Sequence, residues 1–203
     1  MPALAGSGGE RIAFERRDQA AARAAVLRRS DVRPAGWTGG PIKPDLSPPE
    51  TCRNYRPKQS DLVLTGAAES SFLRSDGRAM DSEVKVLRTA RMVSLDWRRE
   101  VLAPGVMSCQ RRLFGKSLGS NAKVVSFTRI PFPRIARYVA AFRAVAAVPA
   151  GNGKTNRVIV DLVLVSRRRS ELSLVTLAPF KARAQVAADE RRLIRLMLSR
   201  TKV

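Results

Sequence analysis

The chain has 203 residues, which suits one domain of about 130–150 residues plus an extension, and 44% of its residues are hydrophobic. It carries 38 Lys and Arg against 17 Asp and Glu, a formal net charge of +21, and it contains no His. The lack of His excludes Ser–His and Cys–His nucleophile pairs and most zinc sites. No apolar run reaches the roughly 18 residues of a membrane span, and no stretch carries a catalytic signature.

The N-terminal 50 residues are expected to hold little regular structure apart from one helix. Residues 1–9, rich in Gly and Ala, are predicted to be a disordered leader, and the first 30 residues show no signal peptide. Residues 10–29, rich in Ala and Arg, predict a weakly amphipathic helix. A Pro/Gly-rich wrap follows up to residue 50, and Trp37 is expected to fix it against the main body because an exposed indole is costly.

Residues 51–203 are predicted to form an α+β sandwich domain. Strands are expected at 62–73 and 82–88, joined by a turn whose Asp76-Gly77 pair supplies the positive φ of a tight hairpin. Thr89 is then expected to cap a helix with Val93, Trp97 and Val101 on one stripe. The helical pattern resumes over 106–118, after Pro104-Gly105.

The most apolar part of the chain lies at 157–177. Two runs of β-branched and leucine side chains flank a short basic turn there, and they predict a β-hairpin whose first strand is covered on both faces. Asp161 lies inside that strand and would need an Arg partner if its face is buried. Further strands are predicted at 123–130 and 137–148, and a closing helix at 181–200. Together these elements predict a largely antiparallel sheet of about six strands flanked by helices.

The basic turn of this hairpin is a candidate binding surface. Arg167, Arg168 and Arg169 form a possible surface for an anionic ligand, nucleic acid included. Proteins that bind single-stranded nucleic acid usually interleave aromatic side chains for stacking, and here only 5% of residues are aromatic. The simpler interpretation is that Arg fills solvated positions throughout the chain.

Two other patterns suggest chemistry but have plainer explanations. Residues 151–155 resemble a phosphate-binding loop, yet Val148 stands where that motif needs its first glycine, and a strand is expected to follow instead of a helix. A hairpin loop is therefore predicted. A group of carboxylates near the first hairpin is expected to neutralise neighbouring Arg side chains instead of doing acid–base work or binding a cation. These are Asp61, Glu69, Asp76, Asp81 and Glu83.

The two cysteines, Cys52 and Cys109, stand far apart and in no CxxC pattern. They are either two buried thiols or one disulfide. A disulfide would indicate an oxidising compartment.

The order and spacing of several segments carry a resemblance over roughly residues 20–200. The segments are Ser30-Asp31 and Gly36-Trp37 after an Ala/Arg helix, Cys52 shortly before a strand, Glu83 to Ala90, Cys109 in the long helix, the apolar hairpin, and Ala178-Pro179-Phe180 before the last helix. Together they resemble a family of exported actinobacterial domains with a PsbP-like α/β sandwich. Lipoprotein-type sensor domains and the extracellular sensor domains of membrane serine/threonine kinases belong to it.

This resemblance implies an antiparallel sheet flanked by helices and a Cys52–Cys109 disulfide. It also implies a non-catalytic binding or sensor role without a cofactor, secreted or in the cell envelope. The partner would be a small molecule, lipid, glycan or envelope protein. The alternative function is that of a basic nucleic-acid-associated protein, and the alternative location is the cytoplasm.

Overall fold

The structure is a computed structural model that describes residues 9–33, 35–118, 122–150 and 154–203. Within these ranges, the strands are β1 (Arg11–Ile12), β2 (Trp37–Ile42), β3 (Val63–Arg74), β4 (Ala79–Leu87), β5 (Lys123–Arg129), β6 (Tyr138–Ala150), β7 (Lys154–Arg167) and β8 (Ser170–Pro179). The helices are α1 (Arg16–Ala25), α2 (Ala90–Glu100), α3 (Val106–Ser117) and α4 (Arg183–Arg200). A short 3₁₀ turn at Phe180–Ala182 precedes α4.

All eight strands belong to one open, mixed sheet, counted over the described residues. Its order is β1-β3-β4-β8-β7-β6-β5, and β2 pairs with β3 beside this path. The pair β1–β3 is parallel, whereas the other pairs are antiparallel. The fold is therefore α+β, as predicted, with two strands more than the expected six.

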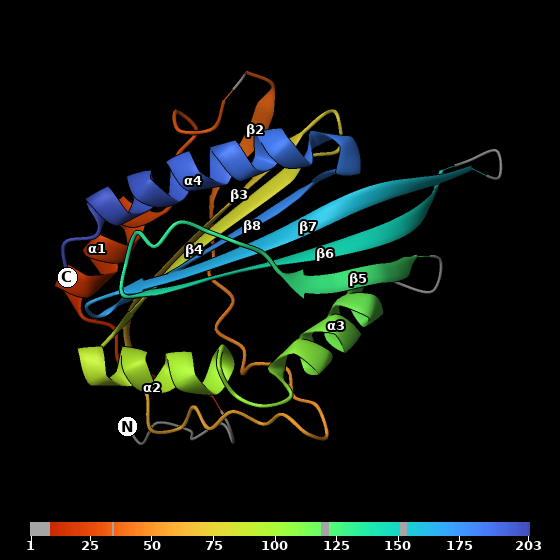
Figure 1. Cartoon of the computed structure of the whole chain (residues 1–203). Helices are drawn as coiled ribbons and strands as arrows, with labels where there is room; N and C mark the ends of the chain where they lie inside the picture. The colour runs from red at the N-terminus through yellow and green to blue at the C-terminus, as the bar shows by residue number, and fades with distance from the viewer. Residues whose placement is uncertain (1–8, 34, 119–121, 151–153) are drawn as a thin grey trace.

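The helices cover the sheet from both sides, with α1 and α4 on one face and α2 and α3 on the other (Figure 1). On the first face, Leu193 and Met197 of α4 pack with Phe72 and Val163 of the sheet. On the second face, the Trp97 ring of α2 stacks on Tyr138 of β6 with 5.4 Å between ring centroids. The layer beneath α4 is apolar, whereas on the α2 side the apolar cluster around Trp97 lies over β6 and β7.

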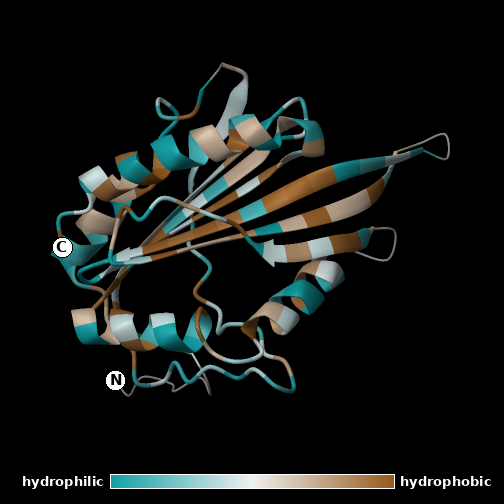
Figure 2. Cartoon of the chain, viewed as in Figure 1, coloured by the Kyte–Doolittle hydropathy of each residue, from teal (hydrophilic) through white to brown (hydrophobic). Residues whose placement is uncertain are grey.

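The apolar hairpin at the centre of the sheet is β7–β8. Val163 pairs with Leu174 and Val165 with Leu172, and all four side chains are buried on the α4 side. Figure 2 shows hydrophobic stretches along β6 and β7, as expected for strands covered on both faces. The predicted hairpin is confirmed, and so is the alanine-rich strand that became β6.

Two local predictions are also confirmed. Thr89 is the N-cap of α2, and its Oγ1 accepts a hydrogen bond from the backbone N–H of Met92 at 3.2 Å. Trp37 is only 4% exposed and packs in the core beneath α1 and α4. Among the described helices, none is both long and apolar enough to cross a membrane.

The N-terminal prediction needs correction. Residues 10–29 are not one helix, because Arg11–Ile12 joins the sheet as β1 and the helix covers only Arg16–Ala25. The wrap is also partly regular, since Trp37–Ile42 forms β2 against β3. Gly39 makes this pairing possible: its φ is +114°, and a Cβ there would lie 2.2 Å from the Ser71 carbonyl oxygen.

Two predicted features fall largely outside the described part of the chain. The expected leader at residues 1–9 is described only at Gly9. The loop that resembles a phosphate-binding motif is described only at Lys154 and Thr155, which begin β7. A strand follows that loop, as predicted, so no helix N-terminus is available there to hold a phosphate.

Candidate functional site: an acidic hollow beneath helix α2

The face of the sheet beneath α2 carries a row of polar side chains. Along β4 and β8, successive residues alternate between the two faces, and the buried apolar ones point toward α1 and α4. The residues between them point toward α2. The strand register places Lys85 opposite Glu171 and Glu83 opposite Ser173, so these four side chains lie together.

Helix α2 and the N-terminal segments close over this row. Asp96 and Glu100, four residues apart on α2, face the sheet beside Trp97 and Val101. Gln59, 2% exposed, donates hydrogen bonds from its Nε2 to Asp96 Oδ1, at 2.7 Å, and to Glu100 Oε1. Glu10, just before β1, brings its Oε2 within 3.4 Å of Lys85 Nζ.

A cavity of about 90 Å³ lies between α2 and the sheet. Carboxylates and Lys85 form part of its wall, and Trp97, Val101 and Leu164 form its apolar part. Two wider depressions adjoin it, one sharing Glu83, Lys85 and Ser173 with the cavity and the other Glu100 and Leu164. Residues of the Pro-rich wrap line both depressions.

The cavity and both depressions together are called here the acidic hollow. Eight of the 17 Asp and Glu of the chain line it, namely Asp45, Glu50, Glu69, Asp81, Glu83, Asp96, Glu100 and Glu171, and a ninth, Glu10, adjoins it through Lys85. Among the described residues, Lys85 is the one Lys or Arg that lines it. In a chain of net charge +21, this is a strong segregation of charge.

Lys85 is the internal counter-charge of the acidic hollow. Burial opposes its charged form, but the carboxylates of Glu10, Glu83, Glu100 and Glu171 outweigh burial and raise the pKa of Lys85. The ammonium therefore stays protonated over the physiological range.

The carboxyl groups nearest the cavity hold protons unusually tightly. Burial raises the pKa of Glu171 well above its ordinary value, and neighbouring Asp96 adds to the effect. Carboxylate oxygens of Asp96 and Glu171 lie within 4.8 Å of each other, and burial raises the pKa of Asp96 as well. Burial, then the charge of Asp96, raises the pKa of Glu100 to about 7. At neutral pH the carboxyl groups therefore share protons among themselves instead of all being ionised.

Three of these residues could surround a small cation. Carboxylate oxygens of Glu10, Asp96 and Glu171 lie within 4.8 Å of one another. Hard oxygen donors of this kind suit Ca²⁺ or Mg²⁺. Lys85 already supplies one positive charge next to Glu10, which partly balances the three carboxylates.

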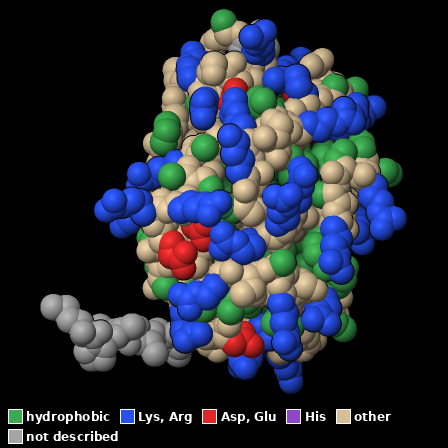
Figure 3. Space-filling view, turned by 90° about the vertical axis from the view of Figure 1, so that its left-hand side faces the viewer, with side chains coloured by type: hydrophobic (Ala, Val, Ile, Leu, Met, Phe, Trp, Pro, Cys, Tyr) green, Lys and Arg blue, Asp and Glu red, His purple; other side chains and the backbone are tan. Residues whose placement is uncertain are grey.

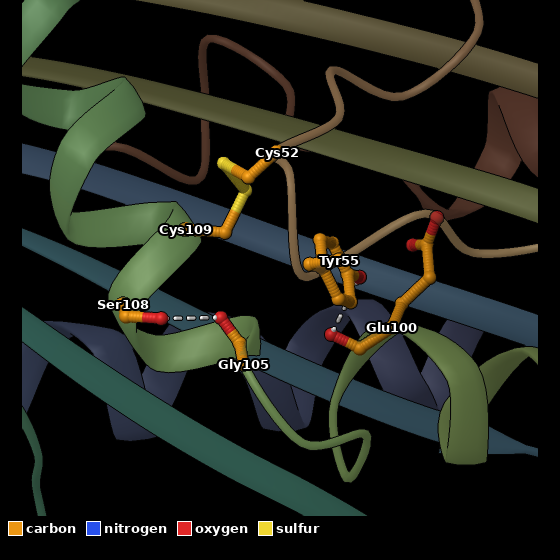
Figure 4. Close-up of a disulfide and its surroundings, with 6 residues drawn as sticks. All are labelled: Cys52, Tyr55, Glu100, Gly105, Ser108 and Cys109. Atoms are coloured by element: carbon orange, nitrogen blue, oxygen red, sulfur yellow. Dashed lines mark hydrogen bonds between the residues drawn. A yellow bond between two sulfur atoms is a disulfide. The ribbon is translucent and has the colours of Figure 1, made fainter.

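The wall formed by the Pro-rich wrap is held by a disulfide. Cys52 and Cys109 of α3 are bonded, with Cα atoms 5.7 Å apart, as the family resemblance implied (Figure 4). Tyr55 donates a hydrogen bond from its hydroxyl to the Glu100 carbonyl oxygen at 3.4 Å. The residues directly after the Pro-rich wrap are thus tied to α3 and to the end of α2, on either side of the depression that Tyr55 lines.

The predicted basic turn lies outside the acidic hollow. Arg167 and Arg168 are exposed, whereas Arg169 is half-buried and bonds to both carboxylate oxygens of Asp18, at 2.9 and 2.7 Å. The three arginines therefore do not act as one surface, because the guanidinium of Arg169 already has a buried carboxylate partner.

The carboxylates noted in the sequence divide into two groups. Asp61 pairs with Arg99, at 2.6 Å, and Asp76 lies 3.3 Å from Arg78, so both neutralise Arg as expected. Glu69, Asp81 and Glu83 instead line the acidic hollow. The Arg partner expected for buried Asp161 is Arg143, its cross-strand neighbour, whose Nε donates to Asp161 Oδ1 at 2.7 Å.

Sequence reasoning missed Glu10, Asp96, Glu100 and Glu171. One signal was available: Asp96 and Glu100 stand four residues apart next to the apolar stripe of Trp97 and Val101, so they lie at the edge of a buried helix face.

The chain matches no known protein family and no curated protein.

Proposed function

We propose that the protein is a non-catalytic ligand-binding module of the sensor type, with a PsbP-like sandwich, and that its ligand enters the acidic hollow. The observation that carries this proposal is the two-sided wall of the cavity, apolar at Trp97 and Leu164 and carboxylic at Asp96 and Glu171. A site of this kind fits a small molecule that has an apolar body and one polar end.

The chemistry of the carboxylic wall defines the polar end of the ligand. Burial away from water raises the pKa values of Asp96, Glu100 and Glu171, and for Glu100 and Glu171 the charge of Asp96 adds to the effect, so these carboxyl groups retain protons. An ammonium group placed among them would relieve the repulsion between their ionised forms and displace protons. We therefore assign the ligand to the class of small organic amines with an apolar substituent.

The same proposal places the protein outside the cytoplasm, secreted or in the cell envelope. The Cys52–Cys109 bond supports this location, because structural disulfides persist in oxidising compartments. Alkylation of free thiols in acid-quenched native cells tests it. Labelling of both cysteines before any reduction would contradict an oxidising location.

The binding proposal is tested by isothermal titration calorimetry with three probes of similar shape: benzylamine, benzyl alcohol and benzoate. At pH 7 we expect saturable binding of benzylamine alone. The heat should depend on the buffer, because protons leave the carboxyl groups on binding. Equal binding of the alcohol, or no binding of benzylamine, would contradict the proposal.

Two variants make the test specific to the site. Glu171→Gln and Asp96→Asn remove carboxylates from the cavity wall and should weaken benzylamine binding at least tenfold, on the order expected for a charged hydrogen-bond partner. Asp189→Asn removes a carboxylate from α4, away from the acidic hollow, and should bind as wild type does. Far-UV circular dichroism and a cooperative unfolding transition confirm that each variant is folded.

A further inference from the structure

Segments from four parts of the chain meet at one end of the sheet. Ile12 of β1 pairs with Leu64 of β3, and the N–H of Arg88, just after β4, donates to the Val63 carbonyl at 2.9 Å. The N–H of Leu87 in turn donates to the Arg169 carbonyl in the β7–β8 turn at 2.8 Å. The starts of α1 and α2 and the β7–β8 turn therefore share this end, on the left of Figure 1.

This end is densely basic and nearly free of exposed acids. Exposed arginines at this end include Arg16, Arg17, Arg88, Arg91, Arg167 and Arg168. Near these arginines, Asp18 is buried and bound to Arg169, whereas Glu15 is exposed. Figure 3 faces this end and shows Lys and Arg side chains spread over it, with few Asp or Glu.

Two large apolar side chains lie exposed at the same end. Ile12 is 53% exposed and Phe14 45%. The backbone N–H groups of Arg11, Ala13 and Glu15 donate to the carbonyls of Leu62, just before β3, and of Leu64 and Thr65 in β3, so the segment is extended and the alternate residues Ile12 and Phe14 share one face. The arginine cluster is thus accompanied by a paired apolar patch.

We propose that this end of the sheet docks on a lipid bilayer that carries anionic headgroups. These exposed arginines bind headgroup phosphates, while Ile12 and Phe14 enter the boundary between headgroups and acyl chains. Nucleic acid would also attract the arginines, but an aliphatic side chain such as Ile12 neither stacks on a base nor hydrogen-bonds to one. This inference is independent of the ligand proposed for the acidic hollow.

Vesicle co-sedimentation with the full chain tests the proposal. The vesicles are phosphatidylcholine alone and phosphatidylcholine with 30% phosphatidylglycerol, each at about 50, 150 and 500 mM salt, a range over which screening rises steeply. Binding is expected only to the anionic vesicles and should fall as salt rises. A parallel titration with duplex DNA tests whether the same surface binds nucleic acid.

Matched variants distinguish binding through this end of the sheet from attraction by the net positive charge of the whole protein. Arg88→Gln/Arg167→Gln/Arg168→Gln should lower partitioning on the order of 100-fold, from about fivefold per basic residue near an anionic membrane. The control Arg111→Gln/Arg112→Gln/Lys123→Gln removes the same charge from α3 and β5, away from this end, and should lower it less than about threefold by the same reasoning. Ile12→Ser/Phe14→Ser should weaken binding about tenfold or more, whereas Ile42→Ser/Leu73→Ser, equally exposed on β2 and β3, should not.

Three results would overturn the proposal: equal losses in the two charge variants, unchanged binding of Ile12→Ser/Phe14→Ser, or binding of duplex DNA without binding of anionic vesicles. Circular dichroism of each variant checks that it is folded, so that a loss of binding is not caused by unfolding. A loss confined to the variants at this end, together with strong salt dependence, supports the proposal.

Discussion

Asp18 at the start of α1 and Arg169 in the β7–β8 turn, 151 residues apart, form an ion pair through both oxygens of the carboxylate. The hydroxyl of Thr65 on β3 donates to the same carboxylate at 2.6 Å. Asp18 is 1% exposed, so its charge depends on these partners for stabilisation. One buried side chain thereby joins the first helix, an early strand and the central hairpin.

Replacing Asp18 with Ala should lower the free energy of unfolding by about 3 kcal/mol, because it leaves the half-buried guanidinium of Arg169 without its partner. Urea denaturation measures the change. Asp189→Ala is the control, since the Asp189–Arg192 pair spans 3.9 Å at the surface and should contribute less than about 1 kcal/mol. Similar urea midpoints for the two variants would contradict the assigned role of Asp18.

Gly66 should tolerate no side chain. It lies at an irregularity of β3 where α1 approaches the strand, and a Cβ there would meet the Asp18 carbonyl carbon and oxygen at 2.5 Å. Gly66→Ala should therefore push α1 outward and cost about 2 kcal/mol of stability. In Gly40→Ala the new Cβ would have no atom within 4 Å, so its urea midpoint should match wild type; an equal loss in both variants would count against close packing at Gly66.

The Cys52–Cys109 bond should contribute about 3–4 kcal/mol to stability, because it closes a long loop in the unfolded chain. Cys52→Ser/Cys109→Ser should lower the urea midpoint by the same amount as reduction of the wild type. The double variant should not respond to reductant at all. Limited proteolysis should then cut first in the Pro-rich wrap, which the bond holds to α3; cleavage that begins elsewhere would argue against this account.

Glu190 should make the protein less stable as pH rises. It is 1% exposed on α4 and faces Asp161, Arg143 and Thr176 from three strands. Burial, then the charge of Asp161, raises the pKa of Glu190 to about 8 in the folded state. The folded protein therefore keeps a proton on Glu190 that the unfolded chain releases above about pH 4.5. The contribution of this proton to the free energy of unfolding is complete below that pH and is lost as pH rises through about 8.

Glu190→Gln tests this directly. The amide cannot ionise, so the variant should lose less stability than wild type between pH 5 and pH 8, by an amount on the order of 2–4 kcal/mol. Thermal melts across this range give the difference. Asp189→Asn, next to it in the chain, should follow the wild-type curve, and parallel curves for wild type and Glu190→Gln would refute the assignment.

The parts of the fold that the sequence predicts well are those with strong local signals. Hydrophobic runs predict the β7–β8 hairpin, and Thr89 predicts the start of α2 through its hydroxyl. By contrast, β1 and β2 have no such signal. Arg11–Ile12 is only two residues long, and Trp37–Ile42 contains Gly39, Gly40 and a proline, so their strand conformation follows from pairing with β3.

The acidic hollow could not be predicted as a unit for a related reason. Glu10 precedes β1, Asp96 lies on α2 and Glu171 on β8, and the strand order brings them together. Their charges do not differ in the sequence from those of Asp61 or Asp76, which pair with nearby arginines. Burial beneath α2 distinguishes the two groups, and burial depends on the completed sandwich.

A positively charged ligand of the acidic hollow must first approach a molecule whose net charge is +21. At about 10 mM salt the Debye length is about 30 Å, so the basic exterior repels the ligand at long range, whereas at 150 mM it is about 8 Å and the repulsion is screened. The association rate of an amine should therefore rise with salt over this range, the reverse of ordinary electrostatic steering. Stopped-flow measurements should show that the association rate constant of benzylamine increases as the salt concentration rises from about 10 to 150 mM.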